Sequence, residues 1–341
     1  MDTKMFISPL SEEQYEEAAA IIRNGGLLGI PTETVYGLGA NALNEQACRN
    51  IYLAKGRPQN NPLIIHIADA SWLSRYCKDI PDVAYKLAET FWPGPLTMIL
   101  PKKDMVPMAT TGGLDTVGVR CPDHPITLEI IRRAGVPVAA PSGNLSGRPS
   151  PTTADHMAED MTGRIDGIVD GGPCGVGVES TIIDLTCDPP CLLRPGGLPL
   201  EKLEEILGLV EVDKAVTSEP EKGEQPKAPG MAYRHYAPKA PVTVVCGNSK
   251  ETAAYIRSHI AETGGVICFH EFAELFPGHE VRNLGHEADL DEQARLVFDA
   301  LRTFDHTEVT EIWAQCPDNA GLGLAIGNRL KKAAGFHVIE V

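Results

Sequence analysis

Two cations flank a glycine in residues 55–63, which read Lys-Gly-Arg-Pro-Gln-Asn-Asn-Pro-Leu. Glycine lets a backbone approach a ligand closely, and the prolines stiffen the turn. Lys55 and Arg57 supply the donors that phosphate or carboxylate oxygens require. The segment therefore indicates an anion-binding site. The alternative is an ordinary solvated helix end, where the helix dipole favours cations.

Five further motifs rich in Gly, Pro, Ser and Thr lie within the first 184 residues. They read Pro-Thr-Glu-Thr-Val-Tyr-Gly-Leu at 31–38, Pro-Gly-Pro-Leu-Thr at 93–97, Val-Arg-Cys-Pro at 119–122, Pro-Ser-Gly-Asn-Leu-Ser-Gly at 141–147 and Glu-Ser-Thr-Ile-Ile-Asp at 179–184. Several follow a short apolar run, which places them at strand ends, where open α/β sheets bind their ligands. Their order and spacing form one pattern.

Each polar residue of these motifs, taken alone, has a possible structural role as well as a chemical one. Arg120 at a strand end suits a bidentate contact with a carboxylate, or a structural salt bridge. Ser142 and Asn144 suit a turn that hydrogen-bonds a ligand, or a plain surface turn. His66 lies in an apolar run, where histidines are more often core residues. Ser142 with His66 as a hydrolase pair would lack the Gly-x-Ser-x-Gly elbow.

Together the motifs resemble the YrdC/Sua family of L-threonylcarbamoyladenylate synthases, in its long, two-domain form. The resemblance is dense over residues of about 10–200, continues through Pro-Gly-Met-Ala-Tyr-Arg-His-Tyr-Ala-Pro at 229–238, and is looser beyond. It implies a nucleotidyltransferase that joins L-threonine, bicarbonate and ATP to L-threonylcarbamoyladenylate and releases pyrophosphate. It also implies that the product passes to the machinery that attaches threonylcarbamoyl to the adenosine beside the tRNA anticodon.

The resemblance implies roles for individual residues as well. Lys55 and Arg57 are expected at the catalytic centre. The implied threonine pocket consists of Thr34, His66, Arg120, Ala140 and Ser180. The implied ATP contacts are Arg57, Asn61, Thr116, Ser142, Ser150 and Arg194, with His235 closing over the nucleotide. No metal cage built by the protein is expected, and Mg²⁺ is expected to arrive with ATP.

Composition sets outer limits on these expectations. A length of 341 residues predicts two domains, and a formal net charge of −16 argues against a protein that coats nucleic acid. The nine cysteines include no Cys-x-x-Cys pair, so neither a disulfide framework nor a structural zinc site is expected. No run of about 18 apolar residues occurs, so we expect a cytoplasmic protein without a membrane partner.

Apolar spacing predicts the elements that position the motifs. A capping box at 11–14 opens a helix that ends at 25–26, and a second helix covers 44–54. Short runs of β-forming residues alternate with helices at 83–91 and 126–134. The runs lie at 27–30, 63–67, 96–100, 117–119, 136–140, 181–185 and 191–193. The fold class is therefore α/β, with a twisted mixed sheet in a YrdC-like domain over 1–210.

A linker and a second domain are expected after this. Residues 211–240 lose periodicity and become rich in Glu, Lys, Pro and Gly, yet they carry Met231, Tyr233, His235 and Tyr236, which a passive tether does not need. We therefore expect a lid that folds back over the cleft. Over 241–341 a β-α-β rhythm predicts a smaller Rossmann-like domain. Its strands are expected at 242–246, 266–269, 311–314 and 336–340, and its helices at 249–262, 290–304 and 324–334.

Two alternative functions remain open at this point. An RNA-binding module could use a concave sheet lined by Lys55, Arg57, Arg120 and Arg194, which the acidic composition disfavours, and direct tRNA binding stays undecided. The other alternative is a carbamoyl-transfer domain as found in larger maturation enzymes, but those belong to longer chains with zinc-finger and acylphosphatase-like parts that this sequence lacks. Selective use of threonine in a pyrophosphate-release assay would distinguish the synthase from both.

Overall fold

Local capping signals place the first two helices of the chain. Ser11 caps α1 (Glu12–Arg23): its hydroxyl accepts from the Gln14 N–H at 3.2 Å, and its own N–H donates to the Gln14 side chain at 2.9 Å. Asn44 caps α2 (Glu45–Lys55), which ends at Gly56 in the left-handed conformation, with φ of 62°. Lys55 therefore lies in the last turn of α2.

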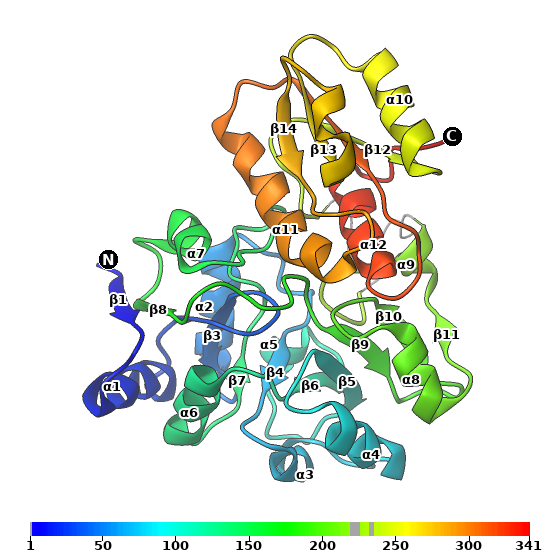
Figure 1. Ribbon diagram of the computed structural model, residues 1–341. Coiled ribbons are helices and arrows are strands. Elements are labelled where there is room, and N and C mark those ends of the chain that lie inside the picture. Colours follow the sequence, from blue (N-terminus) through cyan, green and yellow to red (C-terminus); the bar gives the residue numbers. More distant parts are fainter. Residues whose placement is uncertain (1, 219–225, 232–234) are drawn as a thin grey trace.

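The computed structural model describes residues 2–218, 226–231 and 235–341, which form two α/β domains (Figure 1). Within these ranges the larger sheet has eleven strands in the order β1-β8-β2-β3-β7-β4-β6-β5-β9-β10-β11, with parallel and antiparallel neighbours. Its strands are β1 (Lys4–Ile7), β2 (Leu28–Ile30), β3 (Gly37–Asn41), β4 (Ile64–His66), β5 (Leu96–Pro101), β6 (Thr116–Arg120), β7 (Val138–Ala139), β8 (Gly167–Asp170), β9 (Thr181–Asp184), β10 (Cys191–Arg194) and β11 (Glu211–Val212).

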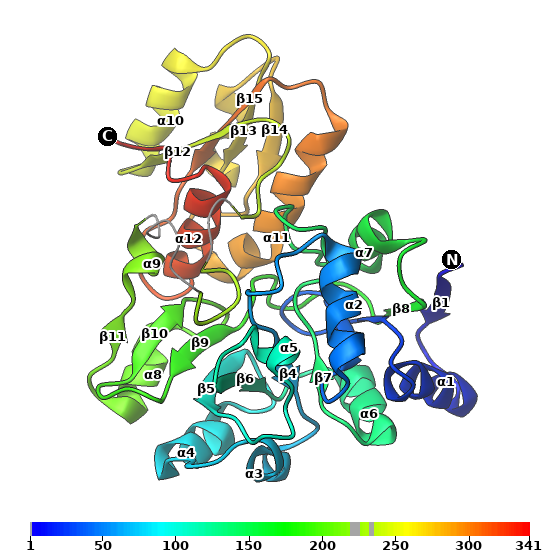
Figure 2. The same cartoon turned by 180° about the vertical axis from the view of Figure 1, so that it is seen from behind.

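Helices cover this sheet and bury its apolar residues. The remaining helices of the N-terminal domain are α3 (Leu73–Tyr76), α4 (Asp82–Phe91), α5 (Met108–Thr111), α6 (Pro125–Ala134), α7 (Ala154–Met161), α8 (Leu200–Leu207) and α9 (Lys214–Thr217), with a 3₁₀ helix at Ala70–Trp72. α1 and α6 lie side by side at one end of the sheet in both views (Figures 1 and 2). One core cluster runs from Phe6 to Val210 through this domain. No helix in the described ranges is long and apolar enough to cross a membrane.

The strand register brings distant polar residues to one place. β4 and β6 are parallel neighbours in which His66 lies opposite Arg120, and β7 places Val138 on the other side of His66. β9 and β10 are antiparallel, with a register shift between Leu192 and Arg194. The ends of these strands therefore meet at one edge of the sheet, as the motif positions predicted.

The C-terminal domain is a five-stranded parallel sheet in the described residues, in the order β14-β13-β15-β12-β16, which confirms the Rossmann-like expectation. Its strands are β12 (Val242–Cys246), β13 (Gly264–Cys268), β14 (Glu280–Asn283), β15 (Glu311–Gln315) and β16 (Val338–Glu340). Its helices are α10 (Ser249–His259), α11 (Leu290–Thr303) and α12 (Gly323–Ala333), with 3₁₀ helices at His270–Leu275 and Phe304–His306. α11 and α12 face the N-terminal domain (Figures 1 and 2).

The segment expected as a linker begins with regular structure. β11 pairs with β10 as an edge strand, with Val212 opposite Leu192, and α9 follows at once. Ala215 and Val216 of α9 are buried, and Ala215 packs in a small cluster with Ile182 of β9. Tertiary packing at the sheet edge thus outweighs the polar composition that favoured a flexible tether. Tyr233 of the expected lid lies outside the described residues.

Candidate active site

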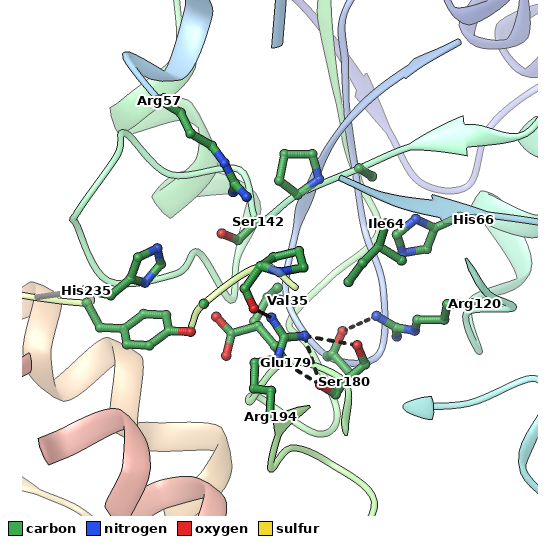
Figure 3. A pocket seen from close by; sticks show the side chains of 16 residues that line it. Val35, Arg57, Ile64, His66, Arg120, Ser142, Glu179, Ser180, Arg194 and His235 are labelled. Atoms are coloured by element: carbon green, nitrogen blue, oxygen red, sulfur yellow. Dashed lines mark hydrogen bonds between the residues drawn. The ribbon is translucent and has the colours of Figure 1, made fainter. Parts of the chain in front are cut away.

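A cavity lies at the strand ends, beside residues 229–230 and 235–236 (Figure 3). It is lined by Thr34, Val35, Arg57, Ile64, His66, Arg120, Ala140, Pro141, Ser142, Glu179, Ser180, Arg194, Pro229, Gly230, His235 and Tyr236. The lining combines apolar walls with a few convergent polar groups, as ligand sites do.

The structure gathers most of the residues predicted for the site and leaves four outside the lining. The predicted residues that line the cavity are Thr34, Arg57, His66, Arg120, Ala140, Ser142, Ser180, Arg194 and His235. Among the described residues, the lining does not include Lys55, Asn61, Thr116 or Ser150. Thr116 begins β6 while Arg120 ends it, which separates them by about 13 Å at the rise of a strand.

At one end of the cavity Arg120 is held by three partners. Its Nη2 lies 2.6 Å from a carboxylate oxygen of Glu33, its Nη1 donates to the Thr34 hydroxyl at 2.9 Å, and its Nε donates to the Gly94 carbonyl at 3.3 Å. The side chain is nearly fully buried yet still lines the cavity. The salt bridge weighed above is therefore present, and it orients a guanidinium that also faces the ligand space.

His66 lies beside Arg120 as a neutral imidazole. Burial, together with the neighbouring Arg120 charge, lowers the pKa of His66 to about 3. Its Nδ1 lies 3.3 Å from the Val138 carbonyl. A neutral ring between an arginine and a carbonyl can hydrogen-bond a hydroxyl or an amino group without adding charge.

Lys55 acts behind the cavity wall. Its Nζ donates to the backbone carbonyls of Ser142 and Asn144, and so holds the turn that presents Ser142 to the cavity. Burial, and then the Arg57 charge, lower the pKa of Lys55 well below its ordinary value. Gly143 of this turn packs on Met157, where an added Cβ would lie 2.0 Å from the sulfur. Close packing, rather than ligand approach, requires that glycine.

Arg57 and Arg194, at the other end of the cavity, differ in how many of their N–H donors are bonded to other protein groups. Arg57 donates to the Pro62 carbonyl at 3.0 Å, while its Nε has no hydrogen-bond partner among the described residues. Arg194 donates to the Ser180 carbonyl at 2.8 and 3.1 Å and to the Pro229 carbonyl at 3.1 Å. Arg57 therefore keeps donor capacity for a ligand, whereas Arg194 fastens the segment at 229–230 to the sheet.

Glu179 receives a cation from the C-terminal domain, which motif reasoning did not reveal. Arg329 of α12, fully buried, donates from Nε to Glu179 at 2.7 Å, and the Ser150 hydroxyl donates to the other oxygen at 2.6 Å. Burial alone would raise the pKa of Glu179, but the charges of Arg329 and Arg194 lower it to about 2. The nearby Lys332 donates to the Gly230 carbonyl. In the sequence both residues look like solvated cations near the end of a helix.

His235 and Tyr236 also line the cavity, and His235 lies on the side of Arg57 (Figure 3). Their rings pack edge to face with centroids 4.1 Å apart, and the Arg329 guanidinium lies 5.6 Å from the Tyr236 ring. Tyr236 has φ of 66°, a conformation that is costly for a residue with a side chain and that clusters at functional sites. Burial lowers the pKa of His235 to about 3, so this ring is neutral as well.

Two family models cover most of the chain. The Sua5_yciO_yrdC model, described as telomere recombination, matches residues 20–196. A second model, described as the C-terminal domain of threonylcarbamoyl-AMP synthase, matches residues 198–335. The border between them falls near the end of β10 and before α8, ahead of β11 and α9.

Full-length relatives agree with both models. The threonylcarbamoyl-AMP synthase of Bacillus subtilis (strain 168) is 47% identical over 350 residues, with 100% of both chains covered. The protein of the same name from Pyrococcus abyssi is 50% identical over 338 residues, with 97% of both chains covered. A crystal structure of P. abyssi Sua5 complexed with L-threonine has a TM-score of 0.91 and 47% identity, and covers 100% of both chains.

Proposed function

Since the chain belongs to the Sua5/YrdC family of threonylcarbamoyl-AMP synthases, we propose that it joins L-threonine, bicarbonate and ATP into L-threonylcarbamoyladenylate and pyrophosphate. One observation carries the proposal: a single cavity joins a small polar end at His66 and Arg120 to a cationic end at Arg57. The first end suits an amino acid with a hydroxyl group, and the second suits a polyphosphate. A nucleotidyltransferase needs both ligands aligned in one enclosure.

The end at Arg120 is assigned to threonine. The guanidinium, oriented by Glu33 and Thr34, would take the carboxylate, and its planar donors favour a bidentate contact. Neutral His66 and the Ser180 hydroxyl would face the rest of the amino acid, beside the backbone at Ala140. P. abyssi Sua5, which shares this fold over its full length, forms a complex with L-threonine, and that supports the assignment.

The end at Arg57 is assigned to the phosphates of ATP. Its unpaired Nε and the backbone of the turn at Ser142 lie on the same wall (Figure 3). Lys55 serves as a positioning residue for that turn, and Arg194 as one for the segment at 229–230. We keep Asn61, Thr116 and Ser150 as proposed ATP contacts that would require the nucleotide to extend beyond the cavity as it stands. Ser150 meanwhile supports Glu179.

Mg²⁺ is proposed to come with the nucleotide. Among the described residues, Glu179 is the one acidic side chain that lines the cavity, and it is engaged by Arg329 and Ser150. The donor set thus fits an ion held mainly by phosphate oxygens and water, which Mg²⁺ prefers. When bound, the ion neutralises charge on the phosphates.

The proposed reaction depends on alignment and charge neutralisation. Bicarbonate first carboxylates the threonine amino group, and an oxygen of the carbamate then attacks the α-phosphate as pyrophosphate leaves. Arg57 would stabilise the charge that accumulates on the phosphate oxygens. Neutral His66 would hold the amino end without trapping it as an ion pair. Walls made by His235 and Tyr236 would exclude water from the adenylate.

Two wider assignments follow from the family. The product would pass to the machinery that transfers threonylcarbamoyl to the adenosine beside the tRNA anticodon, and the cytoplasm would be the place of action.

The four cations considered for RNA binding are all at least nine-tenths buried: Lys55, Arg57, Arg120 and Arg194. They therefore reach only a ligand that enters the cavity. This burial favours a small-molecule enzyme over the RNA-binding alternative.

The decisive assay follows pyrophosphate release and the mass of the adenylate. Protein, ATP, Mg²⁺ and bicarbonate are mixed with threonine, and we expect pyrophosphate together with a product of the mass of threonylcarbamoyladenylate. Omission of bicarbonate is the control and should abolish the product. Pyrophosphate release that is independent of threonine would contradict the proposal.

The segment at 229–236 is tested by a double variant with an intact C-terminal domain. We expect His235→Ala/Tyr236→Ala to fold normally and to lose most synthesis, because both rings line the cavity. The matched control is Tyr255→Ala, an aromatic truncation in α10 far from the cavity lining. If the double variant keeps full activity, the segment only joins the domains and is not a lid.

A further inference from the structure

Two buried thiols face each other in the C-terminal domain, outside the cavity described above. Cys246 ends β12, and Cys316 directly follows β15. The strands are parallel neighbours with Val245 opposite Gln315, and the ladder continues with the Cys316 N–H donating to the Val245 carbonyl at 3.2 Å. In-register Cα atoms on neighbouring strands lie about 5 Å apart, a spacing that a disulfide spans.

Both side chains point to the same side of the sheet. Cys246 and Cys316 belong to the core that packs against α11 and α12, whereas Val245 belongs to the core on the opposite side. The two thiols lie close enough that each shifts the pKa of the other. Gly327 of α12 lies over the pair, since a Cβ there would be 3.1 Å from the Cys316 sulfur. The pair is thus packed in an orientation from which the two sulfurs can bond.

The surroundings make the two thiols unequal. The hydrogen bond from Cys316 lowers the pKa of Cys246 against the effect of burial, and the positive charge of Lys331 acts in the same direction. Glu340 of β16 opposes this effect. The pKa of Cys316 is raised, by its hydrogen bond to Cys246 and by burial. Cys246 is therefore the better nucleophile, and Cys316 is placed as its resolving thiol.

We propose that Cys246 and Cys316 are a modification site at which a hydroperoxide forms a reversible disulfide. The Cys246 thiolate attacks one peroxide oxygen, the O–O bond breaks, and hydroxide leaves as water after taking a proton, which yields a sulfenic acid. Sulfur of Cys316 then attacks the sulfenyl sulfur, the S–O bond breaks, and the thiol proton leaves in a second water. Two thiols lose two electrons and two protons, and hydrogen peroxide gains them.

The bond would join two central strands of the C-terminal sheet under α12. α12 also carries Arg329 and Lys332, which hold Glu179 and Gly230 at the cavity. The disulfide would therefore stiffen the base of the helix that completes the active site, and we expect the oxidised protein to unfold at a higher temperature.

The test uses the full chain, in which the two accessible cysteines that could react with peroxide first are replaced. Cys187 is exposed and Cys191 is partly exposed, so the background variant is Cys187→Ser/Cys191→Ser. After treatment with equimolar hydrogen peroxide we expect the intact mass to fall by two hydrogens, a peptide map to link 246 with 316, and dithiothreitol to restore the mass. The melting temperature should rise on oxidation and fall again on reduction.

Two single variants separate the steps. With Cys316→Ser the reaction should stop at a Cys246 sulfenic acid, which dimedone traps, whereas Cys246→Ser should give no adduct. Lys331→Gln should slow disulfide formation several-fold. The proposal is overturned if the background variant keeps both thiols under peroxide, if the linked peptides involve other cysteines, or if dimedone labels Cys316 first.

Discussion

The two ends of the cavity are built in different ways. The end at Arg120 and His66 consists of residues on neighbouring strands of one sheet, and its ion pair with Glu33 is made within the same domain. The end at Glu179 needs Arg329, which lies 150 residues further along the chain. The first end is complete when the N-terminal domain is folded. The second gains the ion pair of Glu179 only when the domains are docked.

This difference indicates how substrate binding and catalysis are divided. Strand ends hold side chains rigidly, which suits the recognition of a small amino acid. A cavity end that depends on a contact between domains can open or close when the domains move. Such motion suits the binding of a polyphosphate and the protection of a water-sensitive product. We therefore expect variants to fall into two groups, according to the end they touch.

The largest expected effect is at the interface. Arg329→Met leaves the Glu179 carboxylate buried without its cation, which costs about 3–5 kcal/mol. We expect a lower midpoint of urea unfolding and nearly complete loss of synthesis, with threonine binding changed little. Arg329→Met/Glu179→Gln is the matched control and should recover much of the stability. A loss of threonine affinity equal to the loss of ATP affinity would show that the two ends are one unit.

The next prediction separates the ligands. Arg120→Ala should chiefly weaken threonine binding, and Arg57→Ala should chiefly weaken ATP binding, each by roughly 2–4 kcal/mol, because each removes a desolvated charge-assisted contact. Calorimetric titration of both variants with both ligands measures this. In the Arg120→Ala variant the Glu33 carboxylate is left unpaired. Adding Glu33→Gln removes that charge and shows how much of the lost threonine affinity it caused. If neither arginine affects either ligand, both are structural.

A smaller effect concerns the choice of amino acid at the strand-built end. Valine lacks the hydroxyl that His66 and Ser180 could hydrogen-bond in threonine, and we expect this loss to cost about 1–3 kcal/mol. Pyrophosphate release should therefore rank threonine first, then serine, then valine. Ser180→Ala should narrow the gap between threonine and valine. Equal rates with threonine and valine would refute a hydroxyl-reading pocket.

The smallest effect is a pH dependence confined to the interface end. Burial, and then the Arg329 charge, lower the pKa of Lys332 from 10.5 to about 7 in the folded protein. Between these values the unfolded chain holds a proton that the folded chain lacks, so the free energy of unfolding rises with pH over this window. We expect Lys332→Met to reduce the rise between pH 7 and pH 8 by about 1 kcal/mol in urea unfolding. An unchanged slope would mean that Lys332 is charged in the fold.

The sequence predicted more of the cavity end at Arg120 and His66, which is built on strands, than of the end at Glu179, which lies at the domain interface. Capping residues and apolar spacing are local signals, and they predicted α1 and α2, whereas the placing of His66 with Arg120 came from the family resemblance. The strands β1, β3 and β8 escaped prediction, and β3 did so because it is rich in glycine.

At the interface end the missing information was tertiary. Arg329 and Lys332 look like ordinary cations in the last turns of α12 until the domain docks. β11 and α9 have a polar composition and are ordered by the sheet edge that they meet. Arg194, which is expected to contact ATP and which lines the cavity, also donates to Ser180 and Pro229, and nothing in the sequence indicated these bonds. These hydrogen bonds and packing contacts depend on residues distant in the sequence, which no local pattern identifies.

The separation of Glu179 from Arg329 also has a consequence during synthesis on the ribosome. The N-terminal sheet can close once β11 has emerged, but the cation for Glu179 is translated 150 residues after its carboxylate. At roughly 5–20 residues per second, the nascent chain spends roughly 8–30 s before Arg329 is available to pair with that carboxylate. The emerging protein can thus hold a folded first domain while Glu179 still lacks the ion pair that the docked C-terminal domain supplies.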